Sequence, residues 1–295
     1  MALPIDSQPL ASRALDAFLE PATAIVLAWI AAVLLVLHSD PLLATLVVLG
    51  AGGAFVAGLT GVGGAIVMIP LLLYVPPAIG TGQLEVHEVA AITMVHVFAA
   101  AASGVAGHLR EGFVDRRLVF TLGAGMMIGS LTGAVISRWL PAEILKGTFA
   151  TMAAAGAIML FVMRGRAPDE IAVTTWKTAT GFLLALGVGL LAGAVGAGGS
   201  FLLLPLMLYV LHVPPRLAVG SSLAIAVAGA TTGLAGKLIT GQVALWPALA
   251  LVAGALPAAQ LGAAASQRAK VTHLRFLLAA MIALVAVKMW LEILK

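Results

Sequence analysis

Cysteine is absent from this 295-residue chain, and charged side chains are scarce, at 9% of all residues. Without cysteine the protein has neither a disulfide framework nor a thiolate metal site. Soluble domains carry about 25% charged residues, so 16 Lys and Arg with 12 Asp and Glu are too few to cover a water-exposed surface. This scarcity excludes a soluble enzyme and a disordered protein. The basic residues are also scattered, so they offer no patch for nucleic acid.

Apolar residues make up 62% of the chain, and the mean hydropathy is +1.12. They form runs of helical length, separated by charged residues or by Pro and Gly. Because backbone groups inside a bilayer must pair within their own segment, these runs predict the transmembrane helices of an all-α polytopic membrane protein. The predicted segments are residues 22–38, 42–58, 64–75, 88–107, 117–138, 142–163, 176–193, 199–211, 216–236, 243–265 and 271–291.

Two glycine-rich segments, Gly58–Gly64 and Gly193–Gly199, interrupt these apolar runs. Each glycine costs a helix about 1 kcal/mol relative to alanine, so a cluster of them ends it. The apolar arm that follows each cluster is only about 18–20 Å long at 1.5 Å per residue, whereas the hydrocarbon core is about 30 Å thick. Each cluster therefore predicts a broken helical hairpin whose turn lies inside the membrane.

The glycine clusters belong to an internal repeat. Seven residues recur 135 positions later: Gly58, Gly61, Gly63, Gly64, Pro70, Tyr74 and Val75 match Gly193, Gly196, Gly198, Gly199, Pro205, Tyr209 and Val210. After a predicted Val-Pro-Pro turn in each copy, Val75–Pro77 and Val213–Pro215, the offset becomes 129: Gly104, Gly107, Gly112, Gly125, Gly129, Gly133 and Lys146 match Gly233, Gly236, Gly241, Gly254, Ala258, Gly262 and Arg275.

The repeat divides the chain into four parts. We predict a polar lead-in with an extra span, residues 22–38, within 1–40. Repeat 1 is 41–163, a cytoplasmic linker is 164–175, and repeat 2 is 176–295. Each repeat has one glycine-broken hairpin and three transmembrane helices.

The basic residues indicate how the two repeats are oriented, because Lys and Arg favour the cytoplasmic side. If each broken hairpin enters and leaves on one face, eleven of the 16 Lys and Arg lie inside. The five outside are Arg138, Lys146, Lys237, Lys288 and Lys295. A model in which each pair crosses once separates the charges less well. An odd number of spans per repeat then predicts inverted repeats.

Broken backbone at membrane depth is tolerated where it lines a cavity, and the half-helix after each break presents free N–H groups and a positive dipole end. Such ends attract anions, and two of them brought together by inverted repeats form the usual site of a secondary transporter. The alternative for a single cluster is close helix packing. Neither cluster has the spacing of a nucleotide-binding loop.

Polar residues inside the apolar segments extend this candidate site. Thr93 and His96 share a helix face, and His96 is either a proton-coupled or anion-binding group or a hydrogen-bonded interior histidine. Ser221 and Ser222 align with Ile92 and Thr93, which gives both repeats a hydroxyl at the same level. The predicted substrate-binding residues are Thr60, Gly61, Gly63, Gly64, Thr93, His96, Gly196, Gly198, Gly199, Ser200, Ser221 and Ser222.

Other features are assigned structural roles. Gly125, Gly129 and Gly133 form a doubled GxxxG ridge, which lets helices approach closely and would permit a homodimer. Lys237, with its repeat counterpart His108, is expected to extend to the membrane interface. Carboxylates are absent from the apolar segments, which argues against a carrier of cations.

The repeated segments Gly58–Tyr74 and Gly193–Tyr209 resemble the paired signatures of the sulfite exporter TauE/SafE family, also called the toluene sulfonate uptake permeases. The resemblance covers residues 41 to 293. It implies an inner-membrane permease for sulfite, sulfonates or related organic anions, with inverted repeats and substrate near the glycine breaks. The family motif supports Gly61, Gly63, Gly64, Gly196, Gly198 and Gly199 as site-forming backbone. The extra span 22–38 departs from the shortest members.

The sequence thus predicts a multi-pass transporter in the cell inner membrane that moves a small anion by alternating access. A proton or sodium ion is the expected coupling ion, and no metal, cofactor or catalytic residue is expected. An anion channel is the alternative, since it would use the same half-helix dipoles. An intramembrane enzyme would have only the Thr93, His96 and Ser103 face, which lacks an acidic partner.

Overall fold

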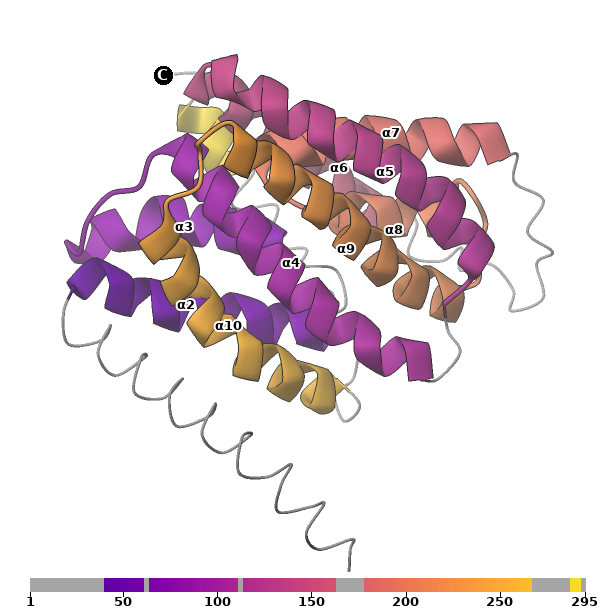
Figure 1. Ribbon diagram of the computed structural model, residues 1–295, viewed down its shortest axis with the longest axis horizontal. Helices are drawn as coiled ribbons and strands as arrows, with labels where there is room; N and C mark the ends of the chain where they lie inside the picture. Colours follow the sequence, from indigo (N-terminus) through magenta and orange to yellow (C-terminus); the bar gives the residue numbers. More distant parts are fainter. Residues whose placement is uncertain (1–39, 61–63, 111–113, 163–177, 267–286, 293–295) are drawn as a thin grey trace, which may run out of the picture.

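The computed structural model describes residues 40–60, 64–110, 114–162, 178–266 and 287–292 (Figure 1). The extra span 22–38, the linker 164–175 and most of the predicted span 271–291 lie outside these residues. The described part is built of helices and turns, without a strand. In chain order the elements are α2 (Pro41–Thr60), α3 (Ala65–Ile79), α4 (Val86–Arg110), α5 (Arg116–Ile136), η2 (Ser137–Trp139), α6 (Ala142–Val162), α7 (Thr178–Val195), α8 (Ser200–Tyr209), α9 (Pro215–Ile239) and α10 (Leu245–Ser266).

The long helices match the lengths that a bilayer requires. Among the described residues, four helices are long and apolar enough to cross a membrane: Arg116–Trp139, Thr178–Val195, Leu217–Ile239 and Leu245–Gly262. Shorter apolar helices include Ala65–Ile79 and Ser200–Tyr209, which follow the two glycine segments. The prediction of a polytopic α-helical membrane protein is confirmed.

The two Val-Pro-Pro segments have different structures, so the predicted turn at Val75–Pro77 is wrong. Helix α3 continues through Pro76 and Pro77 and ends at Gly80, which has a left-handed φ of 75°. In the second copy α8 ends at Tyr209, and Pro214 and Pro215 instead start α9, where the fixed φ of proline suits the first turn. Repeat 1 carries extra residues after its prolines, and these leave room for the longer helix.

Six of the seven long helices in the described part pack in the order α2, α10, α4, α9, α5 and α7, each against the next, and the seventh, α6, packs on α7 and α8. Figure 1 shows α2 with α10 on one side of the molecule, α5 with α7 on the other, and α4 and α9 between them. The shorter α3 packs on α2 and α4, and α8 packs on α9. Helix α4 therefore runs through the middle of the protein.

The GxxxG ridge of α5 is buried inside the chain. A methyl group on Gly125, Gly129 or Gly133 would collide with a backbone carbonyl of α7, and these helices run parallel, since their contacts advance together along both chains. The close approach that the sequence predicts is confirmed. Because α7 of the same chain occupies the ridge, the ridge is not a free surface for a homodimer.

Candidate functional site

The second glycine segment forms a sharp break between α7 and α8. Gly196, Gly198 and Gly199 have φ values of 78°, 63° and 72°, in the left-handed region that favours glycine. A side chain at Gly196 would collide with the backbone carbonyl of Ala90, and one at Gly198 would collide with the side chain of Val97. The backbone of this break therefore lies directly against α4.

The first glycine segment also separates two helices, because α2 ends at Thr60 and α3 begins at Ala65. Gly64 caps α3 with an ordinary φ of −69°. A Cβ atom on Gly64 would lie 2.9 Å from Cε1 of His96. The same imidazole places its Nε2 atom 3.3 Å from the carbonyl oxygen of Gly50, to which it donates when that nitrogen carries the proton. The first break therefore reaches α4 through His96.

The two breaks meet α4 at the same turn, since His96 and Val97 are consecutive residues. Ala90, Thr93 and Val97 are three and four residues apart, so they share one face of the helix. Because Ala90 and Val97 both contact the second break, Thr93 lies on the face that covers it. Thr93 and His96 therefore stand between the two glycine breaks.

Both residues carry a polar atom without a hydrogen-bond partner among the described residues. Oγ1 of Thr93 and Nδ1 of His96 are buried and make no hydrogen bond within the described part of the protein, and both side chains are 0% exposed. A buried unpaired polar group costs about 1–3 kcal/mol, so its presence calls for an explanation, such as a bound molecule. These two atoms have the property expected of groups that bind a ligand.

The remaining predicted residues fall into three groups. Ser200 is buried at the first residue of α8, beside the second break. Oγ of Ser221 accepts a hydrogen bond of 3.0 Å from the backbone N–H of Asp115, and Oγ of Ser222 donates to the carbonyl of Val219. Gly61, Gly63 and the side chain of Thr60 lie outside the described residues.

Ser221 lies far from Thr93 along the helix axes. Its partner Asp115 is the N-cap of α5, whereas Met94, the neighbour of Thr93, and Ser130 of α5 both lie against Gly233. At 1.5 Å per residue, Asp115 and Ser130 are about 22 Å apart along α5. Among the described residues of the predicted site, Thr93, His96, Gly64, Ser200 and the glycines of the second break are brought together.

The prediction that Lys237 extends to the interface is wrong, because the side chain is 0% exposed. Its ammonium group donates to Oγ of Ser137 at 2.6 Å, to Oε1 of Gln242 at 3.0 Å and to the carbonyl of Ala194 at 3.1 Å. Ala194 lies in the last turn of α7, so the positive charge faces the negative end of that helix dipole. Lys237 thereby fixes the end of α7 immediately before the second break.

Sequence reasoning also missed Ser130. This hydroxyl is buried without a hydrogen-bond partner in the described structure, and the Ser130 backbone leaves no room for a side chain on Gly193. For Ser130, the available signal was a lone serine inside an apolar helix. For Lys237, it was a lysine matched to a histidine in the repeat. Neither signal distinguishes a buried group from an interfacial one.

The buried polar groups have a common electrostatic character. Where the exposure of the described residues is defined, the buried polar or charged side chains are Thr93, His96, Ser130, Ser137, Ser200, Ser221, Ser222 and Lys237. This set contains a cation and several hydroxyl groups but no carboxylate. The described interior therefore presents hydroxyl groups, an imidazole and one cation.

Comparison with known proteins shows which family the chain resembles. The family model described as Sulfite exporter TauE/SafE matches residues 44–289. The probable membrane transporter protein YunE of Bacillus subtilis is 29% identical over 243 residues, which cover 76% of this chain and 88% of the relative. YjnA of the same organism is 28% identical over 251 residues, covering 80% and 95%.

A probable membrane transporter protein of Xylella fastidiosa (strain 9a5c) is 30% identical over 184 residues, covering 60% of this chain and 68% of the relative. No solved structure matches the chain. The relatives are named as transporters and the family as exporters, not as enzymes. The chain therefore belongs to the sulfite exporter TauE/SafE family and is a multi-pass membrane transporter.

Proposed function

We propose that the protein is a secondary transporter for a small anion, such as sulfite or a sulfonate, which binds between the two glycine breaks. The observation that carries this proposal is the meeting of both breaks at one turn of α4, beside Oγ1 of Thr93 and Nδ1 of His96, which have no hydrogen-bond partner in the described part of the chain. The N-terminal ends of α3 and α8 are close to these atoms, and helix N-termini favour anions. The name of the family supports an oxyanion of sulfur as the substrate.

Two equivalent contacts support inverted repeats as the architecture of this transporter. A methyl group on Gly125 would meet the carbonyl of Phe182 and, at 3.1 Å, the backbone nitrogen of Leu186. The repeat counterpart of Gly125 is Gly254. A methyl group on Gly254 would meet the carbonyl of Val47 and, at 2.9 Å, the backbone nitrogen of Ala51. Val47 and Ala51 lie 135 residues before Phe182 and Leu186. The two repeats thus exchange equivalent contacts, as a two-fold axis requires.

The direction of the central helices supports inversion. Lys237, near the end of α9, contacts Ser137 after α5, and Ser221, near its start, contacts Asp115, so α9 is parallel to α5. The start of α4 contacts the end of α5 through His87 Nε2 and the carbonyl of Leu140, at 3.0 Å, so α4 is antiparallel to α9. Helices α4 and α9 are counterparts in the repeat, and their antiparallel arrangement supports a two-fold axis in the membrane plane.

This architecture suits alternating access, in which residues 41–163 and 176–295 rock against each other about the central site. The proposal includes a cytoplasmic linker at 164–175, the extra span within 1–40, and a proton or sodium ion as the coupling ion. Helix α5 packs closely on α7, and its counterpart α10 packs closely on α2. These two equivalent contacts between the repeats are surfaces on which such a movement can occur.

A flux measurement distinguishes this carrier from an anion channel. We expect proteoliposomes with the purified protein to take up labelled sulfite or an alkyl sulfonate saturably, and to exchange it against unlabelled anion on the other side. Monovalent cations should not compete with the labelled anion for uptake. Uptake that rises linearly with concentration and shows no exchange would establish the channel, and uptake of cations alone would refute the anion assignment.

The site itself is tested by Thr93→Val, which keeps the shape of the side chain and removes Oγ1. A hydrogen bond to a charged group contributes about 1.5–3 kcal/mol, so we expect the KM for the anion to rise at least about tenfold. Thr231→Val is the matched control, because Oγ1 of Thr231 is exposed and donates to the carbonyl of Val227 in its own helix. Equal KM values for the two variants would place the substrate elsewhere.

A further inference from the structure

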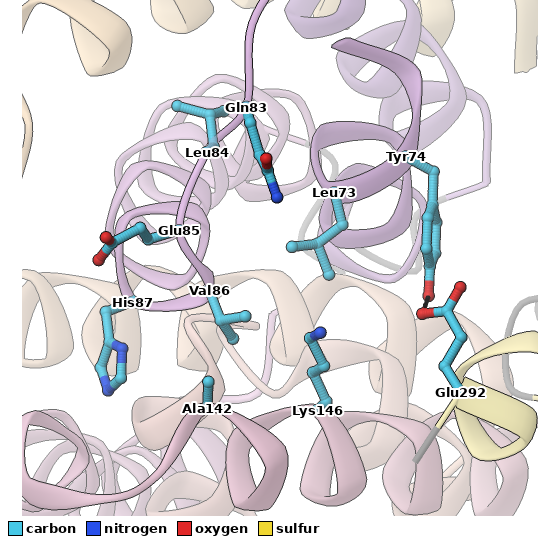
Figure 2. A pocket seen from close by; sticks show the side chains of 10 residues that line it. All are labelled: Leu73, Tyr74, Gln83, Leu84, Glu85, Val86, His87, Ala142, Lys146 and Glu292. Atoms are coloured by element: carbon cyan, nitrogen blue, oxygen red, sulfur yellow. Dashed lines mark hydrogen bonds between the residues drawn. The ribbon is translucent and has the colours of Figure 1, made fainter. Parts of the chain in front are cut away.

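A surface cavity of about 380 Å³ opens at the end of the molecule where α4 begins. Its walls come from α3, from residues 83–87, from α6 and from the helical residues 287–292. Figure 2 shows the side chain of Lys146 rising from α6 into this space, between Val86 on one side and Leu73 and Tyr74 on the other. The cavity lies apart from the Thr93 and His96 pair, and nothing described so far gives it a role.

The acidic groups of this cavity leave Lys146 without an ion pair among the described residues. Oε2 of Glu292 accepts a hydrogen bond of 2.9 Å from the hydroxyl of Tyr74, and Lys288 lies 3.7 Å from the centre of the same ring. The carboxylate of Glu85 points away from Lys146 in Figure 2. The ammonium group of Lys146 is therefore available to an anion that enters the cavity.

A second, deeper cavity continues from the first. It shares Leu73, Val86 and Lys146 with the surface cavity, so these three residues form the junction. Its free volume is only about 10 Å³, which is room for about one water molecule. Apart from Lys146 the described residues that line it are apolar: Ile69, Leu73, Val86, Val89, Ala90, Leu145, Phe149, Val195 and Met289.

The deep cavity ends at the second glycine break. Val195 is the last residue of α7, and the carbonyl of Ala90 lies where a side chain of Gly196 would be. The two cavities therefore lead from the surface, past Lys146, to the α4 face that holds Thr93. An anion on this route loses its hydration in an apolar passage, and a cation at the mouth of that passage offsets part of the loss.

We propose that the surface cavity is the vestibule through which the anionic substrate reaches the glycine breaks, and that Lys146 selects for negative charge at its inner end. This inference rests on the proposed function, and it adds the access route and the residue that sets charge preference there. The narrow passage between Leu73, Phe149 and Val195 is the closed part of the route.

The absence of native cysteine allows a test that requires no transport. A single cysteine at Leu73→Cys stands at the junction of the two cavities, and its labelling is followed with two methanethiosulfonates of similar size, one carrying a sulfonate and one a quaternary ammonium. With Lys146 present, we expect the sulfonate reagent to react faster than the quaternary ammonium reagent. Adding Lys146→Gln should lower the ratio of the anionic to the cationic labelling rate about tenfold, and Lys146→Arg should preserve it.

Arg138→Gln is the matched control for this measurement. Arg138 lines a neighbouring cavity of about 390 Å³ on the same end of the protein, together with Gln242 and His87. If Lys146 acts locally, Arg138→Gln should leave the labelling ratio within twofold of its starting value. An unchanged ratio in Lys146→Gln, or an equal change in both variants, would overturn the proposal.

Transport then separates this inference from the proposed function. In proteoliposomes, we expect Lys146→Gln to raise the KM for the anion about tenfold. We expect Lys146→Cys to regain its affinity for the anion after reaction with a cationic thiosulfonate in detergent, but not after reaction with an anionic one. A wild-type protein that carries no anion, while the labelling ratio still depends on Lys146, refutes the proposed function and retains the vestibule. Anion transport that is insensitive to all Lys146 variants refutes the vestibule and retains the function.

Discussion

The two glycine breaks share a sequence motif, but glycine is required for different reasons in each. In the second break Gly196, Gly198 and Gly199 all have left-handed φ values, and the backbone of α4 lies directly behind Gly196. In the first break Gly64 has an ordinary helical φ, and its nearest neighbour is the side chain of His96. One break therefore needs glycine for backbone conformation and for space, whereas at Gly64 the need is for space alone.

The partners of the two breaks differ in the same way. The second break is held from outside by Lys237, whose ammonium group binds the carbonyl of Ala194 before the turn. His108 is the repeat counterpart of Lys237, so repeat 1 has no lysine at this position. Repeat 1 instead places His96 between α2 and α3, where repeat 2 has Ile225 on its equivalent helix. The duplicated motif thus has one copy whose preceding helix end binds Lys237 and one copy that faces the imidazole of His96.

The largest effect is expected for Gly196→Ala. We expect it to lower the free energy of unfolding by about 3 kcal/mol, because left-handed backbone costs an alanine about 1–2 kcal/mol and overpacking about 1–3 kcal/mol. This loss of stability is measured by thermal unfolding in detergent, with tryptophan fluorescence as the signal.

Two glycines serve as controls for Gly196→Ala. Gly241 has a φ of 69° with open space around it, so Gly241→Ala should show the conformational cost alone, about 1 kcal/mol. Gly187 is helical and also faces open space, so Gly187→Ala should be neutral or stabilising. Equal effects at all three positions would show that the contact with α4 is unimportant.

A smaller effect is expected for Lys237→Met. Removing the ammonium leaves the carbonyl of Ala194 without its charged donor, and we expect a loss of about 2 kcal/mol, since hydrogen bonds to charged groups contribute about 1.5–3 kcal/mol. Arg138→Met, at an exposed cation on the same end of the protein, should change stability by less than about 0.5 kcal/mol. Similar unfolding temperatures for the two variants would contradict a role for Lys237 in holding the second break.

The smallest effect is expected for Gly64→Ala, about 1 kcal/mol, because its nearest neighbour, Cε1 of His96 at 2.9 Å, belongs to a side chain, which can shift more easily than backbone. A double-mutant cycle with His96→Ala tests the cause, since removing the imidazole makes room for the new methyl group. We expect the cost of Gly64→Ala to fall in the His96→Ala background, although the contacts at 3.1 Å with Cβ of Ala57 and the carbonyl oxygen of Gly53 remain. If the cost is the same in both backgrounds, the contact with His96 does not explain the glycine at this position.

Much of the fold was predictable because bilayer physics leaves few options. The predicted segments 117–138, 176–193 and 243–265 differ from α5, α7 and α10 by only a few residues at their ends. Glycine clusters in apolar runs also predicted the two helix breaks. The helical continuation through Pro76 and Pro77 was not predictable from the motif, because Val-Pro-Pro is compatible with both a helix end and a helix start.

The candidate site was only partly predictable. Thr93 and His96 were identifiable as polar residues on one helix face, and the fold places them between the breaks. Ser221 and Ser222 have the same sequence signal, but one binds the start of α5 and the other its own helix. Ser130 and the burial of Lys237 gave no distinct signal in the sequence.

By itself, the sequence determined that this protein lies in a membrane, is built from helices and contains two similar halves with glycine interruptions, since composition and repetition are properties of the chain alone. The tertiary structure decided which interruption needs glycine for its backbone angles, that Lys237 is buried, and that Lys146 stands at the junction of two cavities. These properties depend on distances between residues far apart in the chain. Such distances follow from helix packing, because each helix has many faces and only packing decides which neighbour each face meets.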